Sequence, residues 1–424
     1  MSFNMVSIEH RPLTSLLKFI VDNRGKTVPT SDEGIPLIAT NCIKDNELYP
    51  VFERVRYISQ DTYDNWFRAH PIPGDIIFVN KGTPGRVCLV PDPIDFCIAQ
   101  DMMALRVDED VIDNRYLFAV LRSPLFQNQI NNYHVGTMIP HFKKGDLDKL
   151  LIPIPSMRIQ EIIGDYYFTL SHKIETNNRM NKVLDQMAQV IFKQWFVDFE
   201  YPNENGDPYK LSGGEMEWCE EMGREIPKGW LIDTIGNSTS LVTRGIAPKY
   251  AENSEKRVIN QKCIRDGSIN LELSRPHISK VSEDKQIQFG DILVNSTGTG
   301  TLGRVAQVYE DLEDYTVDSH VTIIRPNLEN GLGYMGCLIK NMQPLFENAA
   351  TGSTGQTELG REIIKKMKIL LPESHINEKF SGIYHSICEK MIRSQKENIA
   401  LSNLRDTLLP KLISGELDVS EIQL

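Results

Sequence analysis

The chain has 424 residues, which is too long for one ordinary hydrophobic core and indicates two or three domains. Its composition, 41% hydrophobic and 24% charged, is typical of globular proteins, and no apolar run is long enough to cross a membrane. The formal net charge of −11 argues against a protein that grips nucleic acid through overall positive charge. Any DNA contact must therefore use local patches or depend on partners.

The cysteines and the first residues predict a cytoplasmic protein. The seven cysteines are scattered, odd in number and never form a Cys-x-x-Cys pair, which favours free thiols over disulfides or a zinc site. The start of the sequence lacks the basic and then apolar pattern of a secretory signal. We therefore expect no membrane partner.

Taken in chain order, the first half predicts a mixed domain followed by a long helix. Short β-rich runs at residues 75–79 and 87–90 are bounded by Gly, Pro and Asp turns. A proline-bounded apolar strand at residues 150–155 ends this region. We expect one domain over residues 1–156 and a helix over residues 157–200.

The second half repeats this order. Gly-Asp-Ile at residues 74–76 and Gly-Arg-Val at residues 85–87 recur at residues 290–292 and 303–305. Cys42 and Cys263, and Arg106 and Arg325, are separated by nearly the same interval. A collinear series with a slowly drifting offset indicates a tandem duplication. It predicts a second domain over residues 201–372 and a second helix with a tail over residues 373–424.

The two helical segments share a heptad pattern, with seam positions spaced alternately by four and three residues. In the first segment these positions are Ile163, Tyr167, Leu170, Ile174, Asn177, Asn181, Leu184, Ala188, Ile191 and Trp195. In the second they are Phe380, Tyr384, Ile387, Met391, Ser394, Asn398, Leu401, Arg405, Leu408 and Leu412.

Both seams are apolar at their ends and polar at two central positions. A polar group in a seam disfavours slipped registers, in which it would lack a partner. We therefore expect the helices to pair antiparallel about a pseudo-twofold axis. The predicted fold is α/β (α+β), with two similar globular domains separated by two long antiparallel coiled-coil helices. The alternative is that each helix packs separately on its own domain.

The sequence contains no convincing catalytic motif. Residues 298–303 match Gly-x-Gly-x-x-Gly, but a strand-like run follows where a dinucleotide site needs a helix. Arg304 and Val305 occupy the positions where a phosphate-binding loop requires Lys and Ser or Thr. No methyltransferase tetrad, nuclease cluster or metal-ligand spacing stands out. We expect no catalytic residue, no metal and no cofactor on this chain.

The repeated motifs resemble those of the specificity subunit of type I restriction–modification enzymes. The resemblance rests on the duplicated Gly-Asp-Ile and Gly-Arg-Val hairpin, the turns at residues 136–140 and 352–356, and the Ile-Pro-Ile-Pro or Leu-Leu-Pro strand before each helix. It covers essentially the whole chain. The second half departs from the first at Gln356, which stands where the first half has Ile139 and Pro140.

The resemblance implies two target-recognition domains, each reading half of a bipartite, gapped double-stranded DNA target, on a helical spacer. It also implies docking of two methyltransferase subunits and, through them, restriction or translocase subunits. S-adenosylmethionine is then expected on the methyltransferase partner, and ATP and Mg on the restriction partner.

The duplicated turns are the preferred DNA-contact candidates, because short residues allow close backbone approach while Arg, Lys and Gln reach phosphates or base edges. The candidates are Lys81, Thr83, Arg86, Thr137, His141, Lys143, Lys144, Ser296, Thr297, Thr299, Arg304, Ser353, Thr354 and Gln356. The alternative is that Arg86 and Arg304 only pin their hairpins and that the threonines satisfy turn backbone.

Aromatic residues near the end of the first helix allow two interpretations. Phe192, Trp195, Phe196 and Phe199 are either core between helix and domain or part of a docking face for the methyltransferase. For the whole chain, two other functions stay open. One is a self-sufficient enzyme, and the other is a duplicated-domain protein–protein or RNA-binding scaffold without DNA sequence readout.

Overall fold

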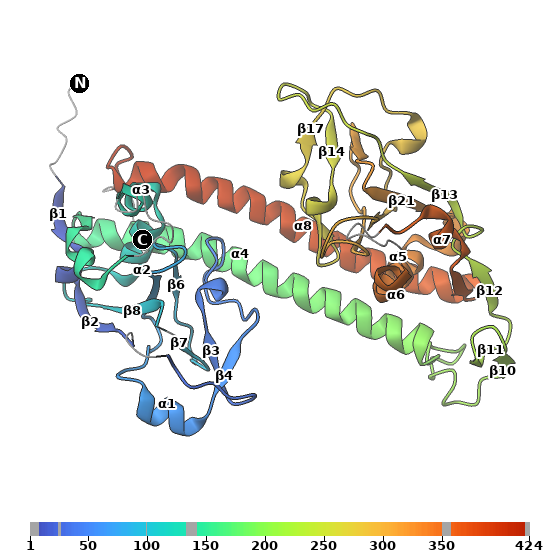
Figure 1. Cartoon of the computed structure of the whole chain (residues 1–424), viewed down its shortest axis with the longest axis horizontal. Helices are drawn as coiled ribbons and strands as arrows, with labels where there is room; N and C mark the ends of the chain where they lie inside the picture. The colour runs from blue at the N-terminus through green and yellow to red at the C-terminus, as the bar shows by residue number, and fades with distance from the viewer. Residues whose placement is uncertain (1–7, 24–26, 99, 133–141, 350–357, 420–424) are drawn as a thin grey trace. The chain divides into compact units, whose positions relative to one another are not determined.

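The computed structural model describes residues 8–23, 27–98, 100–132, 142–349 and 358–419 (Figure 1). The chain forms two compact units, residues 1–179 with 395–424 and residues 180–394. Each unit contains a mixed domain and part of each of two long helices. The two units divide at residues 179–180 and 394–395, inside the long helices, and not where a mixed domain meets a helix. The predicted domain limits therefore stay a prediction.

In the first unit a four-stranded sheet packs beside a three-stranded one. The four-stranded sheet has the order β2-β8-β5-β6, and the three-stranded sheet has the order β4-β3-β7. Strands β1 (Glu9–Pro12) and β9 (Leu151–Ile154) pair separately. The other bounds are β2 Leu17–Val21, β3 Ile35–Ile38, β4 Arg56–Ile58, α1 Gln60–Trp66, β5 Ile76–Val79, β6 Val87–Leu89, β7 Cys97–Ile98, β8 Met102–Val107, α2 Asn114–Arg122 and α3 Pro124–Asn132.

The second unit repeats these sheets in the same order, as β13-β21-β18-β19, β17-β14-β20 and β12-β22. The predicted internal repeat is thereby confirmed. Two further hairpins, β10-β11 and β15-β16, belong to this unit. The bounds are β10 Met216–Cys219, β11 Arg224–Pro227, β12 Leu231–Thr234, β13 Thr239–Arg244, β14 Arg257–Ile259, β15 Ile264–Arg265, β16 Ser268–Ile269, β17 Arg275–Pro276, β18 Ile292–Asn295, β19 Val305–Gln307, β20 Tyr315–Val317, β21 Val321–Pro326, α5 Leu332–Asn341, α6 Gln343–Ala349, α7 Arg361–Lys366 and β22 Lys368–Leu371.

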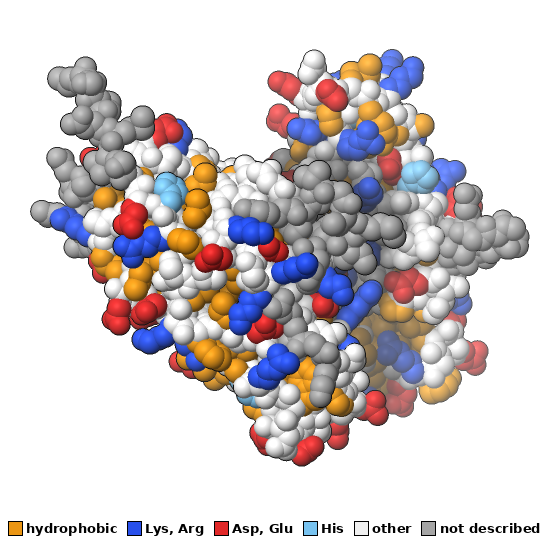
Figure 2. Space-filling view, turned by 60° about the vertical axis from the view of Figure 1, so that its left-hand side comes forward, with side chains coloured by type: hydrophobic (Ala, Val, Ile, Leu, Met, Phe, Trp, Pro, Cys, Tyr) orange, Lys and Arg blue, Asp and Glu red, His pale blue; other side chains and the backbone are white. Residues whose placement is uncertain are grey.

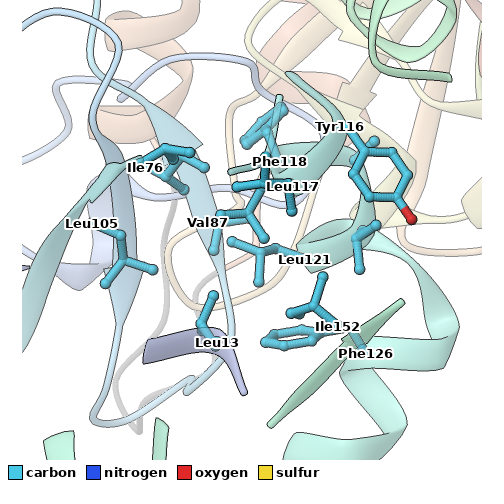
Figure 3. Packing of buried hydrophobic residues seen from close by; sticks show 14 of the residues in the cluster. Leu13, Ile76, Val87, Leu105, Tyr116, Leu117, Phe118, Leu121, Phe126 and Ile152 are labelled. Atoms are coloured by element: carbon cyan, nitrogen blue, oxygen red, sulfur yellow. The ribbon is translucent and has the colours of Figure 1, made fainter. Parts of the chain in front are cut away.

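Strand β5 separates two cores in the first unit. Because side chains alternate across a strand, Ile76 and Phe78 enter one core with α2 and α3, while Ile77 and Val79 enter another with the three-stranded sheet. Figure 3 shows the first of these cores, in which Leu117, Leu121 and Phe126 from the two helices meet the strands. Burial on both faces explains why the strand is continuously apolar rather than alternating.

An ion pair recurs at the same place in both units. Arg106 on β8 donates two 3.0 Å hydrogen bonds to Asp75 just before β5. Arg325 on β21 donates bonds of 2.8 and 2.9 Å to Asp291 just before β18. Both aspartates are almost fully buried. The pair therefore locks the outer end of the central strands, and it accounts for the repeated Gly-Asp-Ile motif and for the matching Arg106 and Arg325.

The two long helices are α4 (Met157–Phe192), continued by a π-helical turn at Lys193–Val197, and α8 (Ser374–Ile413). Within the first unit they run antiparallel, since Tyr166 donates to the carbonyl of Leu404 and Asn177 donates to Asn398. Within the second unit they are also antiparallel, because Asn181 faces Met391 and Phe192 packs on Phe380.

Candidate DNA interface and helical seam

The first duplicated turn joins β5 to β6 and is built on glycine. Gly85 has a φ of 92°, and a Cβ there would lie 2.7 Å from Ile130, so only glycine fits without strain. Lys81 is exposed and 3.7 Å from Asp101, while Thr83 is half-buried. Arg86 is half-buried and lies 3.2 Å from Asp45. The turn thus offers Lys81 to an anion, while Arg86 also holds the turn to its own domain.

The second turn joins β18 to β19, and its candidates have different roles. Thr299 is exposed. Arg304 donates a 2.8 Å hydrogen bond to the carbonyl of Gly300, which is the pinning role considered as the alternative. Ser296 has no exposed surface, and its hydroxyl bonds to Thr322. Its prediction as a DNA contact is therefore corrected: the hydroxyl satisfies buried polar groups beside the turn.

Thr297 belongs to a polar cluster that the sequence did not reveal. Its hydroxyl lies 2.8 Å from Nδ1 of His320, and its carbonyl accepts a 2.8 Å bond from Gln261. Nearby, Arg244 pairs with Glu358 at 2.8 Å and donates to the carbonyls of neighbouring loops. No motif or spacing links these residues, because they come from separate segments of the chain that meet only in the fold.

The remaining contact candidates lie beyond β8. Lys143 and Lys144 are exposed at the start of a 3-10 turn, Lys144–Lys149. The other five candidates lie outside the described residues: Thr137, His141, Ser353, Thr354 and Gln356. On the face shown in Figure 2, Lys and Arg side chains are interspersed with Asp and Glu rather than gathered into one basic field.

All the predicted seam positions are buried or half-buried. In the first unit Ile163, Tyr167, Ile174 and Asn177 of α4 are at most 6% exposed. Half-buried positions such as Leu184 and Leu401 continue the pattern.

The centre of the seam is polar, and its groups bond across it. Asn177 donates 2.8 Å bonds to both Asn398 and Glu397, and Asn398 donates a 2.8 Å bond to Asn178. In the second unit Ser394 is buried, and Asn181 lies 3.4 Å from the carbonyl of Met391. The hydrogen bonds between Asn177 and Asn398 and their partners thus form only in the register that brings these residues together.

Where the first helix has Ala188, the second has Arg405, and this residue lines a cavity in the first unit. Arg405 is 5% exposed, donates to Asp406 and to Ser171, and lies over the Tyr167 ring at 5.3 Å. The cavity has a volume of about 430 Å³, and its charged lining consists of Asp45, Arg86, Arg122, Arg405 and Asp406.

A carboxyl pair lies where the first domain meets α4. Burial, and then the neighbouring carboxyl of Glu175, raise the pKa of Glu47 to about 7. Arg179 bonds Glu175 at 2.7 Å and lies over the Tyr49 ring. No motif marks this pair, because its members are far apart along the chain.

The aromatic residues at the end of α4 are core. Trp195, Phe196 and Phe199 are 3–8% exposed, and Phe196 packs 4.9 Å from Phe380. Their interpretation as a docking face is therefore corrected. Four exposed apolar residues of α4 lie earlier in the helix and on another face: Met180, Val183, Met187 and Val190.

Within the described ranges, no group of three or more His, Cys, Asp or Glu side chains is placed to hold a metal ion. No helix in that same part of the chain combines the length and apolar character needed to span a bilayer.

Comparison with known proteins gives a consistent result. A family model for the type I restriction modification DNA specificity domain matches residues 23–186. The MjaIX specificity subunit of a type I restriction enzyme from Methanocaldococcus jannaschii is 26% identical over 360 residues, which cover 82% of this chain and 79% of that protein. The HindI specificity subunit from Haemophilus influenzae is 23% identical over 407 residues, covering 81% and 86%.

Among solved structures, the S subunit of a type I restriction–modification system from M. genitalium matches with a TM-score of 0.58 and 18% identity. The match covers 97% of this chain and 98% of that one, and it shows a shared fold. The resemblance read from the repeated motifs is thereby confirmed: the chain is similar to specificity subunits of type I restriction–modification enzymes.

Proposed function

We propose that this chain gives a type I restriction–modification complex its DNA sequence specificity by reading a bipartite, gapped double-stranded target. The observation that carries the proposal is the duplication: both units have the same sheets, the same central ion pair and the same turn after the central strand. Two similar domains of different sequence suit two different half-sites, since a protein's repeat is mirrored in the spacing of the sites it reads.

The exposed lysines supply phosphate contacts, and the short turn residues approach the bases. Lys81, Lys143 and Lys144 in the first domain are exposed and suit phosphate. In the second domain, exposed Thr299 lies on the turn whose base is the cluster of Thr297, Gln261 and His320. Because the whole chain is acidic, much of the affinity for DNA comes from its partners.

Catalysis belongs to those partners. The sequence lacks a cofactor loop, a methyltransferase tetrad and a nuclease cluster, which supports a non-catalytic role. S-adenosylmethionine is then held by two modification subunits, and ATP and Mg by the restriction subunits.

The modification subunit docks on the exposed apolar face of α4. Met180, Val183, Met187 and Val190 recur at intervals of three and four residues and are 45–63% exposed. Such spacing places them on one face of a helix, and an exposed apolar stripe of this kind suits a partner helix. The repeat-related residues of α8 are Glu397, Ala400, Leu404 and Thr407, so only α4 carries an apolar residue at all four positions.

The spacer role is tested by inserting seven residues after Asn177 in α4 and seven before Asn398 in α8. One heptad in each helix preserves the seam and adds about 10 Å, or about three base pairs. Methylation in cells that carry the modification subunit should then show the same half-sites with a longer gap. Altered half-sites with an unchanged gap would contradict the proposal.

A further inference from the structure

The hairpin of β10 and β11 has no counterpart among the described strands of the first unit. It lies between the end of α4 and β12, the first strand shared by the repeat, and Figure 1 draws it as a short separate ribbon beyond the end of α4. It is therefore an addition to one copy of the repeat, which leaves the core of the domain intact.

The hairpin is firmly attached to the second unit. Ile226 and Pro227 are buried, and Ile226 belongs to the main core of that unit. The guanidinium of Arg224 lies 4.9 Å from the centre of the Phe199 ring. The hydroxyl of Tyr209 donates a 2.9 Å bond to the carbonyl of Glu215, at the start of the hairpin. The exposed side chains of the hairpin thus stand on a backbone that is anchored to the core of the second unit.

Trp218 on this hairpin is 64% exposed, whereas Trp195 and Trp230 are 8% and 3% exposed. Its direct cross-strand neighbour is Glu225, so an exposed carboxylate shares its face of the hairpin. Glu220, which follows β10, is also exposed. An aromatic face flanked by carboxylates attracts a cation both through the ring and through charge.

We propose that Trp218 and Glu225, supported by Glu220, bind an arginine- or lysine-bearing surface of the modification subunit. The inference rests on the proposed function and adds a contact of defined chemistry to it. Charge complementarity selects the occupant, because the carboxylates repel DNA phosphate and favour a basic protein surface. The site lies on the same unit as the exposed stripe of α4, which continues to Val197, 44% exposed.

Because the described residues of the first unit hold no counterpart of this hairpin, two modification subunits meet unequal surfaces. The copy that contacts Trp218 binds more tightly, since exposed Trp and Arg are the residues that dominate interface energetics. Assembly with this chain then proceeds in two steps of different affinity.

The test uses the full-length chain and the purified modification subunit encoded beside it, with binding followed by calorimetry at two salt concentrations. Trp218→Ala should weaken the tighter step about 10-fold, and Glu225→Lys should weaken it more and reduce its salt dependence. Leu328→Ala and Glu272→Lys are matched controls, because Leu328 is 80% exposed and Glu272 is exposed elsewhere on the same unit. Circular dichroism melting verifies that each variant is folded, which the exposure of both residues predicts.

Unchanged binding of the modification subunit by both Trp218→Ala and Glu225→Lys would overturn the inference. The inference would also be overturned if the two variants weakened self-association of this chain, or DNA binding by the chain alone, and left binding of the modification subunit unchanged. These outcomes are separable from failure of the proposed function. If deleting the gene removes methylation at a gapped motif while both variants bind normally, only the hairpin inference fails.

Discussion

Asn177 of α4 donates a 2.8 Å hydrogen bond to Asn398 of α8 at the centre of an otherwise apolar seam. Asn177 is 5% exposed, so its amide has little access to water. A buried amide that finds partners in only one alignment penalises every other alignment. The contact therefore fixes the register of the two helices, on which any spacer role depends.

The single variant Asn177→Leu should lower the free energy of unfolding by about 1–2 kcal/mol, because the side-chain amide oxygen of Asn398 loses its hydrogen-bond donor. Adding Asn398→Leu should restore stability, since both positions then suit an apolar seam, but the register becomes less specific. Urea unfolding of the two single variants and the double variant measures the coupling. Asn403→Ala, at an exposed position of α8, is the control. If the two substitutions changed the free energy of unfolding additively, the proposed coupling between Asn177 and Asn398 would be contradicted.

Breaking the central ion pair of the second unit should be costly. Arg325→Met leaves the fully buried Asp291 without its partner, and losses of about 3–5 kcal/mol are typical when one member of a buried pair is removed. Asp291→Asn in the same chain should recover part of the loss, because no charge is then buried. Thermal unfolding of the single and double variants tests this. An Arg325→Met variant as stable as the wild type would show that the pair is not important, and one as stable as the double variant would show that the unpaired charge is not the cause of the loss.

The Asp291 pair should also respond to pH. Burial raises the pKa of Asp291, and in Arg325→Met the opposing guanidinium is gone. An acid whose pKa is higher in the folded than in the unfolded state contributes stability at low pH and loses it as pH rises through the folded pKa. The defect of Arg325→Met should therefore be smaller at pH 5 than at pH 8. A defect that is larger at pH 5 would contradict the assignment.

Glu47 predicts a second pH effect, in the first unit. Its pKa is raised from the ordinary 4.5 to about 7, so the folded chain holds a proton that the unfolded chain releases. Stability should fall as pH rises from about 4.5 to 7, by about 1 kcal/mol after allowance for solvent screening. Glu47→Gln should remove this slope, whereas Glu109→Gln, at an exposed position, should leave it unchanged. Unfolding free energies at pH 5 and pH 8 decide between these outcomes.

Phosphate contact by the first domain is tested with Lys143→Ala and Lys144→Ala combined. In the assembled complex, the logarithm of DNA affinity should depend less steeply on the logarithm of salt concentration, by about two units of slope. The target sequence should stay the same, because phosphate contacts carry no base information. Lys379→Ala, an exposed lysine of α8, is the matched control. An unchanged slope would remove both lysines from the interface.

Features that recur along the chain could be predicted from the sequence, either from the heptad spacing within a helix or from the offset between the two halves. The heptad spacing placed Ile163 and Phe380 in a seam, and the constant interval between Arg106 and Arg325 marked equivalent positions before their ion pairs were known. These signals are local or repeated, so one chain suffices to find them.

Features made by long-range contact could not be predicted. Ser296 belongs to a motif rich in turn residues, yet the neighbouring strand buries it against Thr322. His320 joins Thr297 from a distant loop, and Trp218 differs from Trp230 only in what covers it. Burial of a single side chain depends on tertiary packing, which a motif does not encode.

The central claim is that this chain selects the DNA sequence modified by its partners. It is tested most directly by mapping adenine methylation across the genome of a host that carries the gene and its neighbouring modification subunit, with and without the gene. We expect a split motif with a fixed gap to lose methylation when the gene is removed. Unchanged methylation, with the modification subunit present and active, would contradict the claim and favour the scaffold interpretation.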